Sequence, residues 1–142
     1  MTDHHRKLER MYLGAPINRF YLPRIAIREG ECEIWCDARP SMHHAAGGVH
    51  GSVFFKMLDD AAFFAVASTV LDVLMLTASF HISLFRPLTT GALHSRGRVV
   101  RGSQTLCVAE AVLFDSDGRE AARGIGDFAR SRIGLAPDIG YA

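Results

Sequence analysis

The chain has 142 residues, of which 49% are hydrophobic, enough for one domain with a single buried core. Its 16 basic and 15 acidic residues give a formal net charge of +1, so neither nucleic acid nor an anionic membrane surface is an expected partner. The three cysteines are predicted to be free and buried. Cys32 and Cys36 lie about 13 Å apart in an expected strand, too far for a disulfide, and Cys107 stands alone in an apolar pattern.

The N-terminal part of the chain predicts a helix and then a hairpin. Residues 1–10 are polar and lack the apolar stretch of a secretory signal or anchor, so we expect a cytoplasmic protein. Helix formers with mixed charges predict a short leading helix over residues 3–13. Two extended segments between residues 24 and 38 flank Glu29-Gly30, and the second alternates between apolar and polar residues, as a half-buried strand does.

The middle of the chain predicts a loop followed by a long buried helix. Residues 41–49 contain small residues, glycines and histidines without helical or strand periodicity, which indicates a loop. Residues 51–70 are apolar on nearly every side and too many for a strand, so we expect a helix that its surroundings bury. The apolar run at 61–76 is too short and too charged at its edges to be a membrane span.

The remainder predicts four strands. Residues 74–85 alternate, with Thr77, Ser79 and His81 on one face, and turn signals then separate strands near 92–101, 104–115 and 119–130. Short turns between consecutive strands predict an antiparallel meander with the long helix across one face, an α+β fold of one sheet layer and one helix layer. We expect the tail, residues 134–142, to be loosely ordered.

The start of the long helix could hold an anionic oxygen. A helix that begins at Gly51 presents unpaired backbone N–H groups and the positive end of its dipole. Glycine at this position allows a substrate carbonyl to approach the backbone without a Cβ in the way. The alternative is that Gly51 only makes the tight entry into a buried helix.

Asp59 is the candidate for chemistry on the same helix. It has Phe55 four residues before it and Phe63 four residues after it, and burial beside phenyl rings costs a carboxylate free energy unless something uses it. The alternative is a solvated residue at the helix edge. Asp60 is turned about 100° away and follows Lys56 by four residues, which predicts an ordinary surface ion pair.

Distance decides how Gly51 and Asp59 could cooperate. Eight residues of helix span about 12 Å, whereas an oxyanion donor and an attacking carboxylate must each come within roughly 3 Å of one carbonyl group. If both groups act on one substrate, the site must combine Gly51 of one subunit with Asp59 of another. This predicts a symmetric dimer with antiparallel helices and two equal sites.

The histidines do not indicate a metal site. His43, His44 and His50 cluster before the helix, but no pair has a recognised zinc spacing and no cysteine stands close in sequence. A serine-hydrolase elbow, a phosphate-binding loop and a dinucleotide fingerprint are all missing from the sequence. We therefore expect neither a metal nor a bound cofactor.

The segment HHAAGGVHGS at residues 43–52, followed by Asp59, resembles a known motif. It is similar to the H-N-x-x-G-x-x-H-G-G…D signature of the hotdog-fold acyl-CoA thioesterases of the phenylacetate-pathway (PaaI-like) type. Phe85-Arg86-Pro87 is similar to the family's aromatic or aliphatic residue followed by Arg-Pro. The resemblance covers residues 24–130. It implies a single hotdog domain over residues 1–142, with an antiparallel sheet wrapped around a long central helix, in a homodimer or a dimer of dimers.

The resemblance also implies roles for individual residues. Asp59 would be the nucleophile or the general base for water, and Gly51 would supply the oxyanion N–H. His50 would help to place the thioester carbonyl. Thr77 falls where members of the family often have a serine or threonine that holds the carboxylate or the water. The substrate would be an acyl-CoA.

Two residues depart from the motif and two more are candidates for substrate binding. His44 stands where the family has asparagine, and it could form a similar hydrogen bond with a charge that depends on pH. Ser52 stands where the family has a second glycine. Phe63 could contact the acyl group, although phenylalanines on a central helix are more often core residues, and Arg86 could lie near the CoA phosphates.

Two other functions remain open at this point. An acyl-thioester hydratase or dehydratase would share the scaffold, and a non-catalytic acyl-CoA binding module would keep the pocket without the reaction. Release of free CoA thiol separates hydrolysis from both. The acyl group itself is not determined by the sequence.

Overall fold

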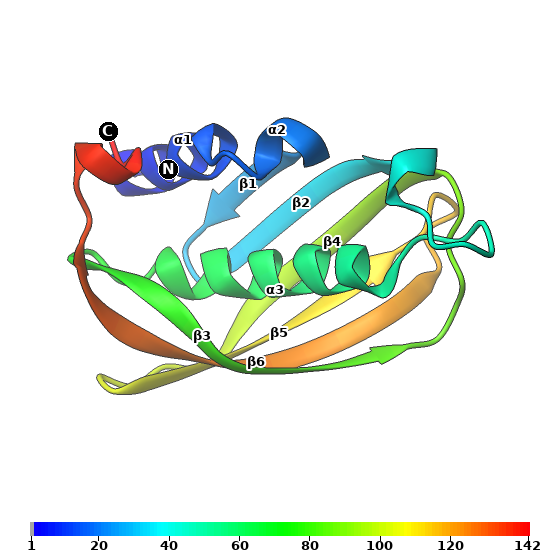
Figure 1. Ribbon diagram of the computed structural model, residues 1–142. Coiled ribbons are helices and arrows are strands. Elements are labelled where there is room, and N and C mark those ends of the chain that lie inside the picture. The colour runs from blue at the N-terminus through cyan, green and yellow to red at the C-terminus, as the bar shows by residue number, and fades with distance from the viewer. Residues whose placement is uncertain (1) are drawn as a thin grey trace.

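A six-stranded antiparallel sheet curves around one long helix in the computed structural model, which describes residues 2–142 (Figure 1). The α-helices are α1 (Asp3–Gly14), α2 (Asn18–Tyr21) and the central α3 (Gly51–Ala67). The strands are β1 (Arg24–Arg28), β2 (Glu31–Ala38), β3 (Val73–Leu84), β4 (Gly91–Arg101), β5 (Leu106–Phe114) and β6 (Glu120–Gly134). Short 3-10 helices lie at Pro40–Met42 and Pro137–Ile139. The predicted α+β architecture, with a sheet wrapped around a central helix, is confirmed.

The order of strands differs from the predicted meander. The sheet runs β1-β2-β4-β5-β6-β3, so β4, β5 and β6 form a meander, but β3 pairs with β6 at the far edge and β4 pairs with β2. The prediction of four consecutive paired strands is therefore wrong. Residues 85–90 form a crossing connection and not a hairpin turn, because β3 and β4 are not neighbours in the sheet. At its start, the N–H groups of Phe85 and Arg86 both bond to the carbonyl of Ala121 in β6.

The central helix packs tightly against the sheet because small residues lie at the contact. Ala61, Ala62 and Ala65 have no exposed surface. A Cβ built on Gly97 of β4 would lie 2.2 Å from the carbonyl oxygen of Ala61, so only glycine allows this approach. Helix α3 is thereby held in one position across the sheet.

A bulge in β3 changes which side chains face the helix. The register of β3 with β6 shifts between Thr77 and Ser79, so the β3 residue between them has no pairing partner in β6. Thr77 and Phe80 both reach the helix side, where Phe80 packs against Phe55 of α3 at 5.6 Å between ring centroids. Ser79 instead bonds to Asp127. The prediction that Thr77 shares a face with Ser79 is wrong, since unbroken alternation does not survive a bulge.

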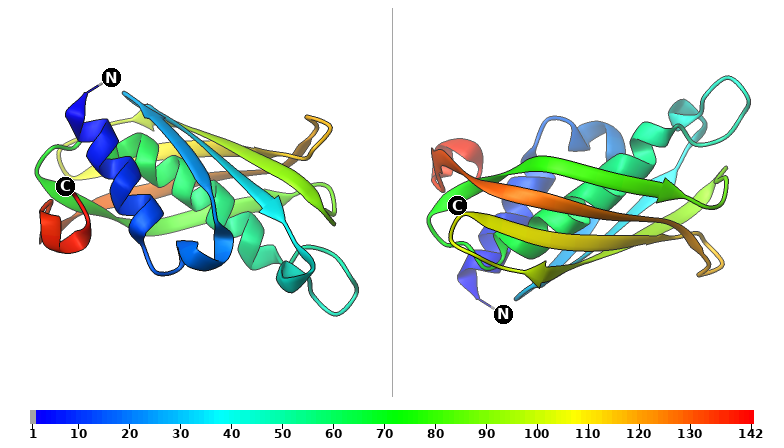
Figure 2. Two further views of the ribbon diagram at one scale, coloured as in Figure 1. Left: turned by 90° about the horizontal axis from the view of Figure 1, so that it is seen from above. Right: turned by 90° about the horizontal axis from the view of Figure 1, so that it is seen from below.

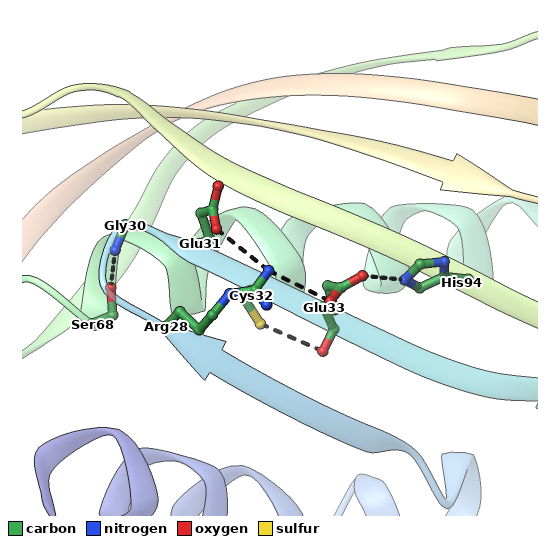
Figure 3. A network of polar contacts seen from close by, with 7 residues as sticks. All are labelled: Arg28, Gly30, Glu31, Cys32, Glu33, Ser68 and His94. Carbon is green, nitrogen blue, oxygen red and sulfur yellow. Dashed lines mark hydrogen bonds and ion pairs between the residues drawn. The ribbon is translucent and has the colours of Figure 1, made fainter. Parts of the chain in front are cut away.

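The turn between β1 and β2 is joined to the far end of α3. Gly30, at φ +76°, turns the chain, and its N–H donates to Ser68 Oγ just after the helix at 2.8 Å (Figure 3). On β2 and β4, His94 Nε2 donates to Glu33 Oε1 at 2.9 Å (Figure 3). These contacts hold the β1–β2 hairpin against the helix and the sheet.

The two chain ends lie together, opposite the loop that precedes α3 (Figure 2). His4 of α1 donates from Nε2 to the carbonyl of Ala67 at 3.0 Å, and its Nδ1 bonds with the hydroxyl of Tyr141 at 2.7 Å. Arg10 also donates to the carbonyl of Ala142 at 2.6 Å. The tail that we expected to be loosely ordered is therefore packed against α1 by specific hydrogen bonds.

All three cysteines are free and buried, as predicted. Within residues 2–142, the structure contains no helix that combines the length and the apolar character needed to cross a membrane.

Candidate active site

Asp59 and Thr77, far apart in the sequence, meet between α3 and β3. The Thr77 hydroxyl donates to Asp59 Oδ1 at 2.8 Å. The bulge in β3 makes this possible, because it turns Thr77 toward the helix while later residues keep the strand paired with β6. The structure thus brings together two of the residues predicted to form the site.

The Asp59 carboxylate lies in a hollow of about 320 Å³ that is mostly apolar. Phe63, Leu74 and Leu76 line it together with residues from the corner between α1 and α2. Burial raises the pKa of Asp59 to about 6, against the opposing effect of the Thr77 hydrogen bond. The negative charge of Asp60 raises this pKa further and Lys56 lowers it. Asp59 is therefore ionised at pH 7 but more basic than an ordinary aspartate, which suits a base or a nucleophile.

The negative charge of Asp60, the next residue, is compensated by a lysine and a tyrosine hydroxyl. It accepts from Lys56 Nζ at 2.5 Å and from the Tyr12 hydroxyl at 2.8 Å. Lys56 and Asp60 side chains are only 11% and 19% exposed, so the predicted ion pair exists but is mostly buried, which corrects the expectation of a surface pair. Tyr12 was missed by the sequence analysis because it belongs to a helix 48 residues away, with no motif linking it to Asp60.

The start of α3 carries its own capping group. His50 is the N-cap, and its Nδ1 accepts from the Ser52 N–H at 3.0 Å and bonds with the Ser52 hydroxyl at 2.7 Å. His50 and Ser52 are exposed, and each satisfies the other. Gly51, as the first helical residue, has an N–H without an intrahelical acceptor.

Nothing within residues 2–142 requires glycine at position 51. Its φ is not positive, and a Cβ built on it would meet no heavy atom within 4 Å. The interpretation that Gly51 only makes a tight entry into the helix loses its support. Open space beside a free N–H at a helix start is what an incoming carbonyl oxygen needs.

A second hollow, of about 350 Å³, surrounds Gly51. Its lining includes His44, Phe54 and Arg86, which come from the loop, the helix and the connection after β3. Gly48 allows the His44 ring to lie close, since a Cβ there would be 2.9 Å from His44 Nε2. Six of the eight predicted site residues thus divide into two groups: His44, Gly51 and Arg86 around one hollow, and Asp59, Phe63 and Thr77 around the other. His50 and Ser52 line neither of these two hollows.

Within residues 2–142, no three His, Cys, Asp or Glu side chains come close enough together to hold a metal ion. His43 instead bonds to the carbonyl of Thr89 at 2.6 Å.

A comparison of the sequence with known protein families identifies the family of this chain. The model of the thioesterase superfamily matches residues 46–122, which include Gly51, Asp59, Thr77 and Arg86. This chain belongs to the thioesterase superfamily. Membership supports hydrolysis of acyl thioesters as the general activity, and it confirms the family resemblance seen in the motif around Gly51. No curated protein matches the sequence.

Solved structures show the same hotdog fold. The PaaI protein from the phenylacetic acid degradation operon of E. coli superposes with a TM-score of 0.84 at 17% identity, over 95% of this chain and all of that one. A putative thioesterase related to phenylacetic acid degradation from Ralstonia eutropha gives 0.78 at 23% identity, over 89% of this chain and 98% of that one. A thioesterase family protein from Silicibacter pomeroyi gives 0.81 at 22% identity, over 89% and 96%. At these identities the likeness establishes the fold.

Proposed function

We propose that this protein hydrolyses an acyl-CoA thioester to the free acid and CoA, with Asp59 as the reacting carboxylate. The observation that carries the proposal is the Asp59 carboxylate itself, held by Thr77 in a mostly apolar hollow whose Lys56 forms its ion pair with Asp60. Neighbouring Asp60 takes the bond from Lys56, so Asp59 keeps its basicity. A carboxylate in this environment can attack the thioester carbonyl or remove a proton from water.

The oxyanion donor in this proposal is the Gly51 N–H of a second subunit. The two hollows of one chain lie along the same helix, so they cannot both reach one carbonyl group. A dimer in which two α3 helices run antiparallel brings Gly51 of one subunit toward Asp59 of the other. His50 would orient the Gly51 N–H as the N-cap, and Ser52 would hold His50 in place.

The free edge of β3 supports such a dimer. This strand of 12 residues pairs with β6 on one side only and forms the edge of the sheet. Exposed apolar side chains lie along it and beside it: Leu76 is 49% exposed, Leu84 50% and Phe85 56%, and Phe55 on α3 is 40% exposed. A long edge strand with apolar side chains is prone to pair with another strand. Pairing two β3 edges about a two-fold axis would place the two α3 helices antiparallel.

The two hollows differ in chemistry, which suggests how the substrate lies. The Asp59 hollow has apolar walls that include Phe63, so it suits the acyl group. The Gly51 hollow contains Arg86 and His44, which suit the CoA side of the substrate. The thioester carbonyl would then sit where the hollow of one subunit meets that of the other.

A thiol-release screen tests the proposal. Wild-type protein is given aryl-, short- and long-chain acyl-CoAs, and free CoA thiol is measured. We expect Asp59→Asn to lower kcat/KM by at least about 100-fold, the usual effect of losing a general base. Asp127→Asn is the matched control, because this carboxylate lies away from the hollow and bonds to Ser79. Full activity of Asp59→Asn would contradict the proposal, and hydration of an enoyl-CoA without thiol release would favour the hydratase alternative.

Mixing two inactive variants tests the shared site. Gly51→Val is expected to fold, because a Cβ at this position meets nothing, and to block the carbonyl. Co-refolding it with Asp59→Asn creates heterodimers with one intact site each, so about a quarter of the wild-type sites should return. No recovery from demonstrably mixed dimers would place both groups in one subunit's site and contradict the shared arrangement.

A further inference from the structure

The corner between α1 and α2 forms one wall of the Asp59 hollow. Tyr12, Ala15, Ile17 and Asn18 line the hollow together with Asp59. These four residues precede the segment, 46–122, that the thioesterase superfamily model matches. Membership of the superfamily therefore assigns no role to this wall.

Hydrogen bonds give the corner a defined shape. The Tyr12 carbonyl accepts from the Ala15 N–H at 3.2 Å and from Asn18 Nδ2 at 2.7 Å, and the Asn18 N–H donates to the Ala15 carbonyl at 2.9 Å. Asn18 is only 3% exposed. Ala15 and Ile17 are thus held on a structured turn and not on a loose segment.

The corner is also joined to the central helix close to Asp59. The Tyr12 hydroxyl donates to Asp60, and the Tyr12 ring packs edge-on against Phe64 at 5.0 Å between centroids. The Lys56 ammonium lies over the Tyr12 ring at 5.1 Å from its centroid. These contacts with Lys56, Asp60 and Phe64, which flank Asp59 on α3, therefore fix the distance between the wall and the Asp59 carboxylate.

Apolar side chains of the wall remain available to a ligand. Ile17 is 57% exposed, and Leu76 of β3, which also lines the hollow, is 49% exposed. Ala15 has a small side chain, so a larger residue at this position would reduce the volume of the hollow. An acyl group that extends past the reacting carbonyl would bury these surfaces.

We propose that the α1–α2 corner determines acyl specificity: Ala15 and Ile17 receive the end of an apolar acyl group larger than acetyl, and Tyr12 is a positioning residue that holds this wall through Asp60. The inference rests on the proposed reaction at Asp59. It assigns the N-terminal helix a part in choosing the substrate. Removal or filling of the wall should change which acyl-CoA is preferred.

The test compares kcat/KM for acetyl-CoA with that for medium-chain and arylacetyl-CoAs. Ala15→Leu should lower the ratio of large-acyl to acetyl kcat/KM by about tenfold or more, because a pocket that loses the space of a few methylenes discriminates on this scale. Ile17→Ala should shift the preference toward longer chains. Leu13→Ala, at an exposed apolar residue of α1 that does not line the hollow, is the control and should leave the ratio unchanged.

Tyr12→Phe tests the positioning role. It keeps the ring against Phe64 but loses the bond to Asp60, and it should lower the large-acyl ratio through KM more than through kcat. A merely structural Tyr12 would lower the melting temperature and leave the ratio unchanged.

The outcomes separate failure of the inference from failure of the proposed function. An active wild-type enzyme whose ratio does not change in Ala15→Leu would overturn the inference alone. An unchanged ratio together with a changed oligomer mass in light scattering would assign the corner to contacts between copies, which also overturns it. A wild-type protein that releases no thiol from any acyl-CoA would overturn the proposed function, and the inference with it.

Discussion

Two neighbouring carboxylates on α3 have opposite surroundings. Asp60 faces α1, where Lys56 and the Tyr12 hydroxyl both bond to it. Asp59 faces β3, where a single neutral donor, Thr77, bonds to it beside apolar side chains. Both residues are partly buried, so the difference lies in compensation of charge and not in exposure.

The difference supports the proposal that Asp60 is structural and Asp59 reactive. A buried charge with a cation beside it is stabilised and unreactive, whereas one without a cation costs free energy in the folded state and remains basic. Burial raises the pKa of Asp59 to about 6, which is the direction expected for a buried carboxylate without an ion pair.

The largest expected effect on stability is in Asp60→Asn. The substitution leaves the mostly buried Lys56 ammonium without its anion, so we expect the free energy of unfolding to fall by about 2 kcal/mol. Activity should fall much less than in Asp59→Asn. Urea denaturation at pH 7.5 measures the change, with Asp127→Asn as the control. A loss below about 0.5 kcal/mol, the size typical of a neutral surface substitution, would show that the pair contributes little.

Thr77→Val should change how activity depends on pH. Valine keeps the shape of threonine but cannot donate to Asp59, and the Thr77 hydrogen bond lowers the pKa of that carboxyl. Its loss should move the acid limb of the kcat/KM profile to higher pH and reduce kcat/KM near pH 6 by about fivefold. An acid limb at the wild-type position would mean that Thr77 does not act on the carboxylate that titrates.

The smallest expected effect is a gain of stability in Asp59→Asn. The folded-state pKa of Asp59, about 6, lies above its usual value of 3.8, so the folded protein binds the proton more tightly than the unfolded chain. Rising pH therefore lowers stability between about pH 4 and pH 6, and the full cost is present above pH 6. Asparagine removes this cost. Because Asp59 is partly solvated, we expect a gain of about 1 kcal/mol at pH 8.

Denaturation of wild type and Asp59→Asn across pH checks this sign. The difference should shrink as the pH falls below 6 and vanish near pH 4. A variant that is less stable than wild type at pH 8 would show that the Asp59 charge is favourable in the fold, which would remove the contrast with Asp60.

Much of the fold followed from local patterns, and the errors occurred where distant segments meet. The long apolar segment could only be a buried helix, and the alternation and turn residues indicated strands at nearly the right places. The pairing of β3 with β6 was missed because a six-residue connection containing Pro87 looks like a turn whether or not the strands on either side pair. The bulge at Thr77 was missed because it leaves no mark in the alternation.

The candidate site shows the same division. Asp59, Gly51 and Arg86 were selected from residue type and spacing, and the structure places them around two hollows of appropriate chemistry. Tyr12 was not selected, because only the folded chain brings α1 to Asp60. The bond from Thr77 to Asp59 likewise depends on the geometry of the bulged strand.

Local periodicity, residue spacing and fixed helix dimensions are enough to predict most of the secondary structure, the family motif and the distance between Gly51 and Asp59 on one helix. Only the folded chain shows that β3 is a free edge, that Lys56 pairs with Asp60 and not with Asp59, and that an N-terminal corner forms a wall of the Asp59 hollow. Each of these depends on contacts between residues far apart in the chain, and such contacts follow from packing and not from local pattern.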